Sequence, residues 1–261
     1  MRGDMEIGLI IIGDEILSGR RTDKHFAKVL ELLQIRGLGL SWVRYLGDDR
    51  TQIAAALRDS MSTNAVVFCC GGIGGTPDDH TRQAAALALS LPLVLHPEAA
   101  ALIEQRCQTT GAPLTPARLR MAEFPAGAAL IPNPYNNIAG FACGRHYFVP
   151  GFPVMAWPMI EWVLDQYYAD HFHVATEASQ SLRIYEVMEA TLTPLMEQIE
   201  REFPAVKVFS LPSIGEDGQR RHIELGVKGD PSVVEAAFPV LLAGLAPYSQ
   251  NIEILSQQKT G

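Results

Sequence analysis

The sequence predicts an α/β protein: a three-layer αβα sandwich on a mostly parallel sheet, followed by a small α+β module. Two observations lead to this fold class. Three apolar, strand-like runs alternate with three helix-like segments in roughly the first 90 residues, the pattern of right-handed βαβ units. After residue 180 the order changes to strand, helix, strand, strand and helix. We therefore expect one domain over residues 1–170 and a second over residues 181–261.

The first strand is expected at Ile7 to Ile12, a continuously apolar run typical of a strand covered on both faces. A loop over 13–19 follows, and Asp23 is a good N-cap for a helix that buries Phe26, Val29, Leu30 and Leu33. The other elements expected in this domain are strands over 40–46, 65–70, 128–132, 140–143 and 146–149, and helices over 49–61, 81–89, 97–110, 115–123 and 154–168.

The second domain is expected to begin after a linker, because residues 171–180 show no hydrophobic periodicity. Beyond that stretch, apolar alternation and helical spacing return. They predict strands over 182–187, 206–211 and 222–227, and helices over 192–202 and 232–245.

Composition and charge limit the classes of partner. The chain has 261 residues, is 48% hydrophobic and carries a formal net charge of −8, so clustered cations for nucleic acid or an anionic membrane are not expected. None of the four cysteines has C-x-x-C spacing, which favours reduced, packed thiols. No signal-peptide pattern and no long apolar span is present in this sequence, and we expect a cytoplasmic protein.

The most informative stretch is the glycine-rich run between an expected strand and an expected helix. Gly71, Gly72 and Gly74 allow the backbone to approach a ligand closely, and the helix that follows offers free N–H groups to an anion. Asp78 and Asp79 lie in the same loop and would repel a bare phosphate unless a hard cation lay between them. The loop therefore predicts a phosphate-bearing ligand handled through a divalent metal.

A second acidic loop follows the first strand and contains Gly13, Asp14, Glu15 and Ser18. Ligands of doubly wound sheets bind beyond the carboxyl ends of the strands. If the first and third strands are neighbours, four carboxylates could converge on a cation such as Mg²⁺: Asp14, Glu15, Asp78 and Asp79. Each of these acids could instead be a turn former or a helix cap.

Four further residues are expected near the entrance to this site. Thr76 could donate its hydroxyl to a phosphate or serve as a cap, whereas capping is favoured for Thr81. His80 is expected to face solvent in the first turn of its helix. Gly151 belongs to the run Pro-Gly-Phe-Pro after a strand, so it could wall the pocket or simply break the chain.

Several ordered motifs resemble the molybdopterin-binding-like domain of the CinA family. The resemblance covers roughly residues 7–168 and extends to the N-terminal domain of eukaryotic FAD synthetases and, more distantly, to MogA and MoaB. Its motifs are the run Gly-Asp-Glu-Ile-Leu-x-Gly at 13–19, Asp23, Gly-Asp at 47–48, the glycine loop at 71–81, Ile-Pro-Asn-Pro at 131–134, Gly-Phe at 140–141 and Pro-Gly-x-Pro at 150–153.

The resemblance implies a usually oligomeric domain that binds a pterin or nucleotide phosphate. In the CinA-type branch it also implies metal-dependent hydrolysis of nucleotide pyrophosphates such as ADP-ribose. The residues carried over are Asp14, Glu15, Gly71, Gly72, Gly74, Thr76, Asp78 and Asp79. The tail resembles the small KH-like module of CinA, and we expect the amidase domain of full-length CinA to be missing.

The sequence departs from the family pattern at two places near the expected ligand site. Gly75 stands where the family usually has Pro, which is expected to loosen the loop. Lys24 and His25 follow Asp23 where Asn is more usual, so a polar contact near the ligand is expected to be lost. The sequence thus supports a metal-dependent nucleotide pyrophosphatase, a non-catalytic molybdopterin- or pterin-binding protein, or, as a weaker hypothesis, a purely interacting module.

Overall fold

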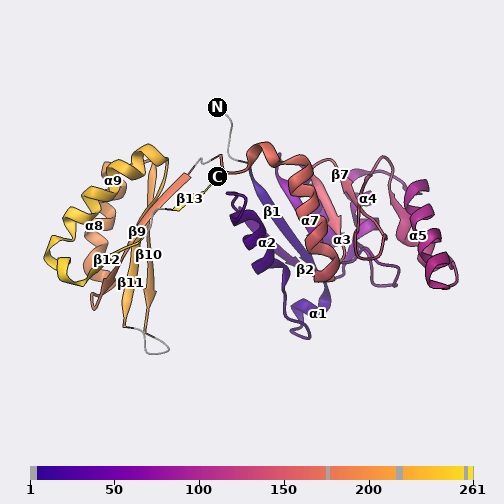
Figure 1. Ribbon diagram of the computed structural model, residues 1–261, viewed down its shortest axis with the longest axis horizontal. Helices are drawn as coiled ribbons and strands as arrows, with labels where there is room; N and C mark the ends of the chain where they lie inside the picture. Colours follow the sequence, from indigo (N-terminus) through magenta and orange to yellow (C-terminus); the bar gives the residue numbers. More distant parts are fainter. Residues whose placement is uncertain (1–4, 175–176, 216–219, 256–257, 261) are drawn as a thin grey trace. The chain divides into compact units, whose positions relative to one another are not determined.

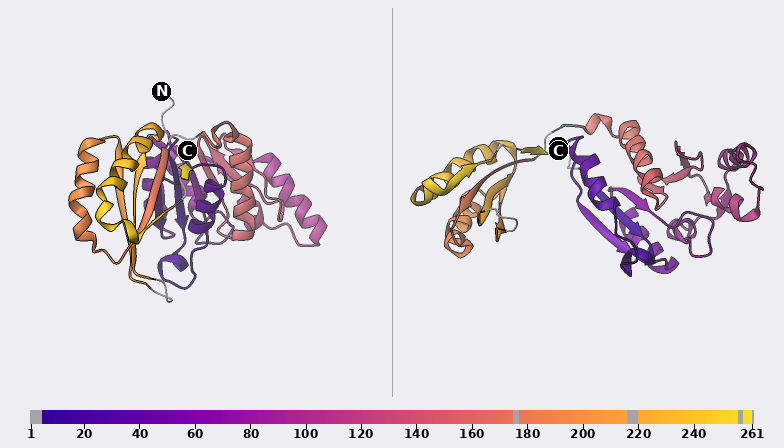
Figure 2. Two further views of the ribbon diagram at one scale, coloured as in Figure 1. Left: turned by 60° about the vertical axis from the view of Figure 1, so that its left-hand side comes forward. Right: turned by 60° about the horizontal axis from the view of Figure 1, so that its bottom comes forward.

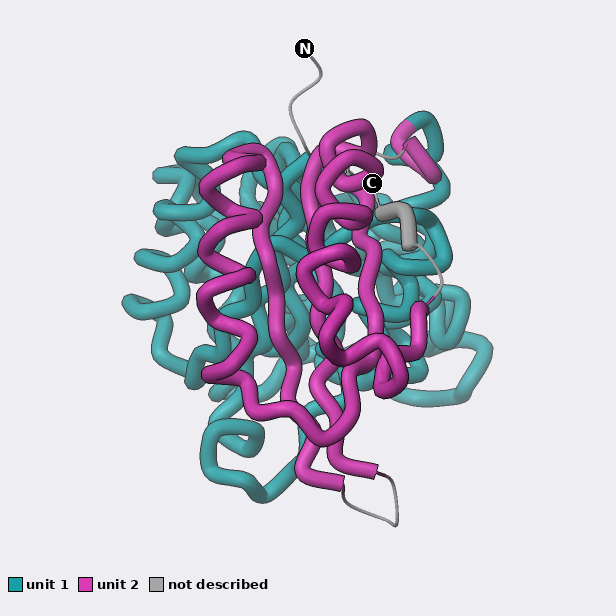
Figure 3. Tube along the Cα trace, turned by 90° about the vertical axis from the view of Figure 1, so that its left-hand side faces the viewer, with its two compact units in different colours: residues 1–170 teal, residues 171–261 magenta. Residues whose placement is uncertain are grey.

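The computed structural model describes residues 5–174, 177–215, 220–255 and 258–260. It divides into two compact units, Met1–Asp170 and His171–Gly261, which are coloured separately in Figure 3. Each unit has its own hydrophobic core, and each is described below by itself.

The first unit is built on a six-stranded sheet in the order β2-β1-β3-β8-β7-β6. The four strands from β2 to β8 pair in parallel, whereas β7 and β6 pair antiparallel, so the sheet is mostly parallel as predicted. The strands are β1 (Ile7–Ile12), β2 (Trp42–Leu46), β3 (Val66–Cys70), β6 (Ala129–Ile131), β7 (Gly140–Cys143) and β8 (His146–Val149).

Helices cover both faces of this sheet and complete three layers (Figures 1 and 2). On one face α3 packs beside α4, and their apolar residues share a core cluster with alternate residues of β1 and β3. On the other face α2 packs beside α7. The helices are α2 (His25–Gln34), α3 (Arg50–Met61), α4 (Thr81–Leu89), α5 (Pro97–Thr110) and α7 (Pro153–Tyr167).

Local sequence signals explain most of these boundaries. Asp49 caps α3 by accepting a hydrogen bond of 2.8 Å from the N–H of Gln52. Asp23 holds the start of α2, since its carboxylate accepts from the N–H groups of His25 and Phe26. The predicted buried face of α2 is wrong at Phe26, which is 37% exposed, because the helix turns His25 inward instead.

Two other local predictions for the first unit are wrong. Asp14–Leu17 forms the short helix α1 where a loop was expected. The helix expected over 115–123 stops early: α6 (Pro116–Leu119) and a 3₁₀ turn, η1 (Arg120–Ala122), lead into β5 (Glu123–Pro125). β5 pairs antiparallel with β4 (Leu93–Leu95), and this pairing between distant segments replaces the last helical turn.

The second unit contains an antiparallel sheet in the order β10-β11-β9-β12, with α8 and α9 packed against it. The predicted linker over 171–180 is wrong for residues 177–180, which begin β9, and Ala178 to Gln180 pair with β11. β13 also pairs with β9. The short turn η2 (Ala169–His171) crosses the boundary between the units. The elements of the second unit are β9 (Glu177–Tyr185), α8 (Glu189–Glu202), β10 (Val206–Ser213), β11 (His222–Gly229), α9 (Pro231–Gly244), η4 (Ala246–Asn251), β12 (Ile252–Ile254) and β13 (Gln258–Thr260).

All four cysteines are free thiols, and Cys69 and Cys70 are buried in β3. No helix in the described part of the chain combines the length and the apolar character needed to cross a membrane.

Candidate functional site

A cavity of about 500 Å³ opens at the carboxyl ends of three parallel strands of the first unit. The strand order places β3 between β1 and β8, so the loops that follow these strands meet at one edge of the sheet. The glycine-rich loop and the acidic loop, about sixty residues apart in the chain, therefore face the same cavity. The predicted site residues that line it are Gly13, Glu15, Gly71, Gly72, Gly74, Thr76, Asp78, Asp79 and Gly151.

The glycine loop is held against β1 and α4. Gly71 has φ 110°, and a Cβ there would lie 2.2 Å from the carbonyl oxygen of Ile12. Gly72 has φ 67°, and a Cβ there would lie 2.3 Å from Oγ1 of Thr81. Both positions therefore require glycine. The buried Thr81 donates its hydroxyl to the carbonyl of Gly71 at 2.9 Å and its N–H to that of Gly72, so it fixes the loop.

The acidic turn of this loop is closed by Asp79. Oδ2 of Asp79 accepts a hydrogen bond of 2.8 Å from the N–H of Thr76, and the hydroxyl of Thr76 donates to the same oxygen. Asp79 thus shapes the turn, and its carboxylate is partly engaged. Asp78 is exposed, and hydrogen bonding from Thr76 and from its own backbone lowers the pKa of Asp78, which keeps this carboxyl ionised at neutral pH.

Asp14 is turned away from the cavity toward the end of β2. Its N–H donates to Oδ2 of Asp48 at 2.9 Å, and the N–H of Asp48 donates to Oδ1 of Asp14 at 3.2 Å. A Cβ at Gly47 would lie 2.5 Å from that Oδ1 atom, so the glycine makes room for the pair. Asp14 does not line the cavity, and neither does Ser18, whose exposed hydroxyl accepts from Arg20.

Asp48 takes the place that Asp14 was expected to occupy in the cavity wall. Burial raises the pKa of Asp48, and the nearby charges of Asp14, Glu15 and Asp78 raise it further. In the sequence, the Gly-Asp pair after the second strand is recognised only as a family motif. Its position after a parallel strand was the signal that could have assigned it to the site.

A buried arginine that was not predicted from the sequence joins the glycine loop to the segment over 120–123. Arg82 is 2% exposed, and its Nη2 donates to the carbonyl of Gly74 at 2.7 Å. Its Nη1 donates to the carbonyls of Arg120 and Glu123. The segment that it holds carries Met121 into the cavity wall.

Gly75 has a packing role in the same region. A Cβ there would lie 2.7 Å from the carbonyl oxygen of Ala117 in α6, so the glycine lets α6 approach the loop. The expectation that Gly75 only loosens the loop is therefore incomplete, because the missing side chain permits a backbone contact.

The far side of the cavity is less acidic. Asn133 is 3% exposed, and its side chain bridges the N–H of Tyr135 and the carbonyl of Ile138. Phe152 and Met155 add an aromatic ring and a flexible thioether to this wall. The cavity thus combines a loop rich in N–H groups and carboxylates with a surface suited to a flat organic ring.

The carboxylates in the wall are hard oxygen donors of the kind that Mg²⁺ prefers: Glu15, Asp48, Asp78 and Asp79. Burial and, to a smaller extent, the neighbouring carboxylates raise the pKa of Asp48, and a cation would relieve the repulsion between these charges. Within the described part of the chain, however, no three acidic, histidine or cysteine side chains are grouped closely enough to hold a metal ion. The donor chemistry fits a divalent cation, and binding one would require these side chains to move together.

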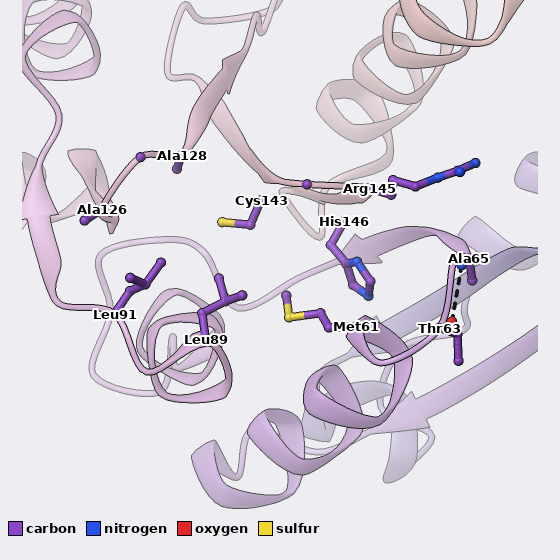
Figure 4. Close-up of a pocket in the computed structure, with 12 residues that line it drawn as sticks. Met61, Thr63, Ala65, Leu89, Leu91, Ala126, Ala128, Cys143, Arg145 and His146 are labelled. Carbon is purple, nitrogen blue, oxygen red and sulfur yellow. Dashed lines mark hydrogen bonds between the residues drawn. The ribbon is translucent and has the colours of Figure 1, made fainter.

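A second cavity, of about 310 Å³, lies near the amino ends of β3 and β8 (Figure 4). Cys143 and His146 point into it, and none of the described residues that line it is acidic. His146 is 3% exposed, its Nε2 lies 2.8 Å from the hydroxyl of Ser60, and burial lowers its pKa to about 4. We interpret this region as part of the scaffold.

The model of a family described as a probable molybdopterin binding domain matches residues 8–169. The chain belongs to this family. A CinA-like protein of Anaeromyxobacter sp. (strain Fw109-5) is 31% identical over 244 residues, covering 86% of this chain and 59% of that protein. The chain therefore spans about three-fifths of the length of this relative. A protein of Caldivirga maquilingensis is 30% identical over 201 residues, covering 76% of this chain and 77% of the relative.

Among solved structures, this molybdopterin-binding-like domain is similar to the CinA protein of unknown function from Thermoplasma acidophilum. The TM-score is 0.56 and the sequence identity 27%, with 62% of this chain and 98% of that chain covered. The predicted CinA-like, mostly parallel α/β fold is thereby confirmed.

Proposed function

We propose that this chain binds a phosphorylated nucleotide or pterin in the cavity of about 500 Å³ and hydrolyses a nucleotide pyrophosphate of the ADP-ribose type with a divalent cation. The observation that carries the proposal is that one cavity wall combines the glycine loop with the carboxylates of Glu15, Asp48 and Asp78. The family match supports a small-molecule ligand of this kind.

The glycine loop and the carboxylates have different roles in this proposal. The backbone of the glycine loop, from Gly71 to Gly74, would receive the phosphate oxygens, and the start of α4 adds a favourable dipole. Glu15, Asp48 and Asp78 would hold the cation, which supplies charge neutralisation and a water of lowered pKa when bound. A water molecule would attack one phosphorus and form the new P–O bond, while the bridging oxygen would leave with the other phosphate. The proton of the water would pass to a carboxylate of the wall that does not hold the cation, and two monophosphates would result.

A non-catalytic pterin-binding role is the second candidate, and a specific observation favours it. The carboxylate of Asp14 accepts a hydrogen bond from Asp48, and that of Asp79 accepts one from Thr76. The described residues contain no preformed group of three metal ligands. Under this reading the acids would organise the loops, and Phe152 would stack on a molybdopterin-like ring. With either ligand, we expect a homo-oligomer, which sedimentation velocity would detect.

Release of monophosphate distinguishes the two candidates. Purified protein is incubated with ADP-ribose or FAD and with Mg²⁺, Mn²⁺ or Co²⁺, and products are separated by chromatography. Hydrolysis predicts release that Asp78→Asn and Glu15→Gln reduce at least a hundredfold, whereas Glu104→Gln, an exposed acid on α5, leaves the rate unchanged. Tight pterin binding by calorimetry without any release would overturn hydrolysis in favour of the binding role.

A further inference from the structure

Charge is distributed unevenly around the candidate site. Three of its carboxylates come from the loops after β2 and β3: Asp48, Asp78 and Asp79. Arg21 is the single cationic side chain among the described residues that line this cavity. It also lines an adjoining compartment of about 350 Å³ together with Lys24, and we call this space the Arg21 compartment. The two spaces taken together therefore have an acidic side and a basic side.

Glu15 and Arg21 lie at the border of the two spaces, since both residues line each of them. The N–H of Arg21 donates to the carbonyl of Glu15 at 2.9 Å, which fixes the backbone of Arg21 beside the cavity. The side chain of Arg21 is exposed, and no described acidic side chain forms an ion pair with it. The guanidinium is thus kept near the cavity and remains available to an anion.

Gly151 also lines both spaces, and a histidine fixes its position. His25 is 4% exposed, and its Nε2 donates to the carbonyl oxygen of Gly151 at 3.0 Å. This hydrogen bond joins the start of α2 to the loop after β8, so His25 makes a polar contact of its own where the sequence was expected to lose one. The border between the two spaces therefore has a fixed backbone at Arg21 and at Gly151.

A diphosphate in this cavity needs a positive charge on the basic side. A divalent cation held by the aspartates would neutralise the phosphate next to it. The second phosphate would extend toward Glu15, whose negative charge repels it. Arginine suits this position, because its planar guanidinium can donate paired hydrogen bonds to the oxygens of one phosphate. Arg21 is the described side chain at the border that offers this chemistry.

We propose that Arg21 binds the phosphate that leaves during hydrolysis, while the glycine loop and the cation hold the phosphate that is attacked. When the bond between the attacked phosphorus and the bridging oxygen breaks, its electron pair stays on that oxygen and the leaving phosphate gains negative charge. The guanidinium of Arg21 donates hydrogen bonds to this group and offsets the charge. This inference rests on the proposed function and adds to it a catalytic residue on the basic side of the site.

Binding is measured by calorimetry with two probes in the presence of Mg²⁺. One is α,β-methylene-ADP, a diphosphate whose bridge cannot be hydrolysed, and the other is AMP. The wild-type protein should bind the diphosphate about tenfold more tightly, the effect of one charge-assisted contact. Arg21→Gln should lose this preference and keep its affinity for AMP. Arg21→Lys keeps the charge without the paired donors, so it should retain part of the preference.

The neighbouring arginine provides a matched control. Arg20 is also exposed, but it lines neither space, and its Nε donates to the hydroxyl of Ser18 at 3.2 Å. Arg20→Gln removes the same charge from the same loop and should keep the full preference for the diphosphate. Both glutamine variants should unfold at the wild-type temperature, because both arginine side chains are exposed.

The rate of ADP-ribose hydrolysis with Mn²⁺ tests the catalytic role. Arg21→Gln should lower kcat about a hundredfold, since the contact strengthens as the leaving group gains charge. Arg20→Gln should leave kcat unchanged. A diphosphate preference that is absent in wild type or persists in Arg21→Gln, or equal losses in the two glutamine variants, would overturn the inference and leave the proposed function intact. Failure of the wild-type protein to bind either probe or to release monophosphate would remove the proposed function, and the inference with it.

Discussion

Asp14 and Asp48 exchange hydrogen bonds, each donating its backbone N–H to the carboxylate of the other. The pair joins the loop after β1 to the loop after β2 and places Asp48 in the cavity wall. It also brings two like charges together, close to those of Glu15 and Asp78, and burial together with this repulsion raises the pKa of Asp48.

The charge of Asp48 is predicted to reduce stability in the absence of cations. A raised pKa means that the folded chain holds this proton more tightly than the unfolded chain. Ionisation of Asp48 therefore lowers stability above its folded pKa, and protonation restores it as the pH falls. Asp48→Asn keeps an oxygen for the N–H of Asp14 and removes the charge.

We expect Asp48→Asn to raise the midpoint of thermal unfolding at pH 7 in chelator-treated buffer and to reduce the further increase caused by Mg²⁺. Glu104→Gln on α5 is the matched control, since it removes an exposed acid far along the chain from these loops. A lower midpoint for Asp48→Asn than for wild type in chelator would contradict the prediction.

Arg82 is predicted to position the glycine loop. Its guanidinium is buried and bonded to the carbonyls of Gly74, Arg120 and Glu123. Arg82→Met fills similar space and leaves these carbonyls unpaired, so it should lower the free energy of unfolding by about 3 kcal/mol and weaken phosphate binding. Arg58→Met, at an exposed position of α3, should change neither quantity. Denaturant titration and calorimetry measure both, and a loss below about 1 kcal/mol would argue against this role.

Thr81 offers a more conservative test of the same loop. Its hydroxyl donates to the carbonyl of Gly71 inside the protein. Thr81→Val keeps the shape and removes the donor, so it should cost about 1–2 kcal/mol and reduce phosphate affinity several-fold. Thr81→Ser retains the hydroxyl and should preserve most of that affinity. If the valine and serine variants bind phosphate equally well, the hydroxyl does not hold the loop in its binding shape.

The parts of this site that follow from local patterns were predictable. An apolar run followed by glycines and then a helix places Gly71 to Asp79 at the carboxyl end of β3. The first and third strands were assumed to be neighbours, and the structure shows that β1 pairs with β3. The orientation of Asp14 was not predictable, because it depends on the short helix α1 and on a partner in another loop. Arg82 and His25 were missed for the same reason: their partners lie 38 and 126 residues away.

The second cavity yields a prediction about pH. His146 is buried against Ser60, and burial lowers its pKa to about 4 from an ordinary value of 6.5. The unfolded chain therefore binds this proton more tightly than the folded one. Stability from the neutral ring is complete above about pH 6.5 and is lost as the pH falls toward 4, by about 3 kcal/mol in total.

His146→Gln tests this because the amide can still donate to the hydroxyl of Ser60 but does not titrate. Its stability at pH 8 should be lower than that of wild type, since the fit of the ring is lost. Between pH 6.5 and 4, however, wild type should lose about 3 kcal/mol more than the variant, measured by urea unfolding at each pH. Parallel curves for the two proteins over this interval would show that His146 is already protonated, or is accessible to water, in the folded state.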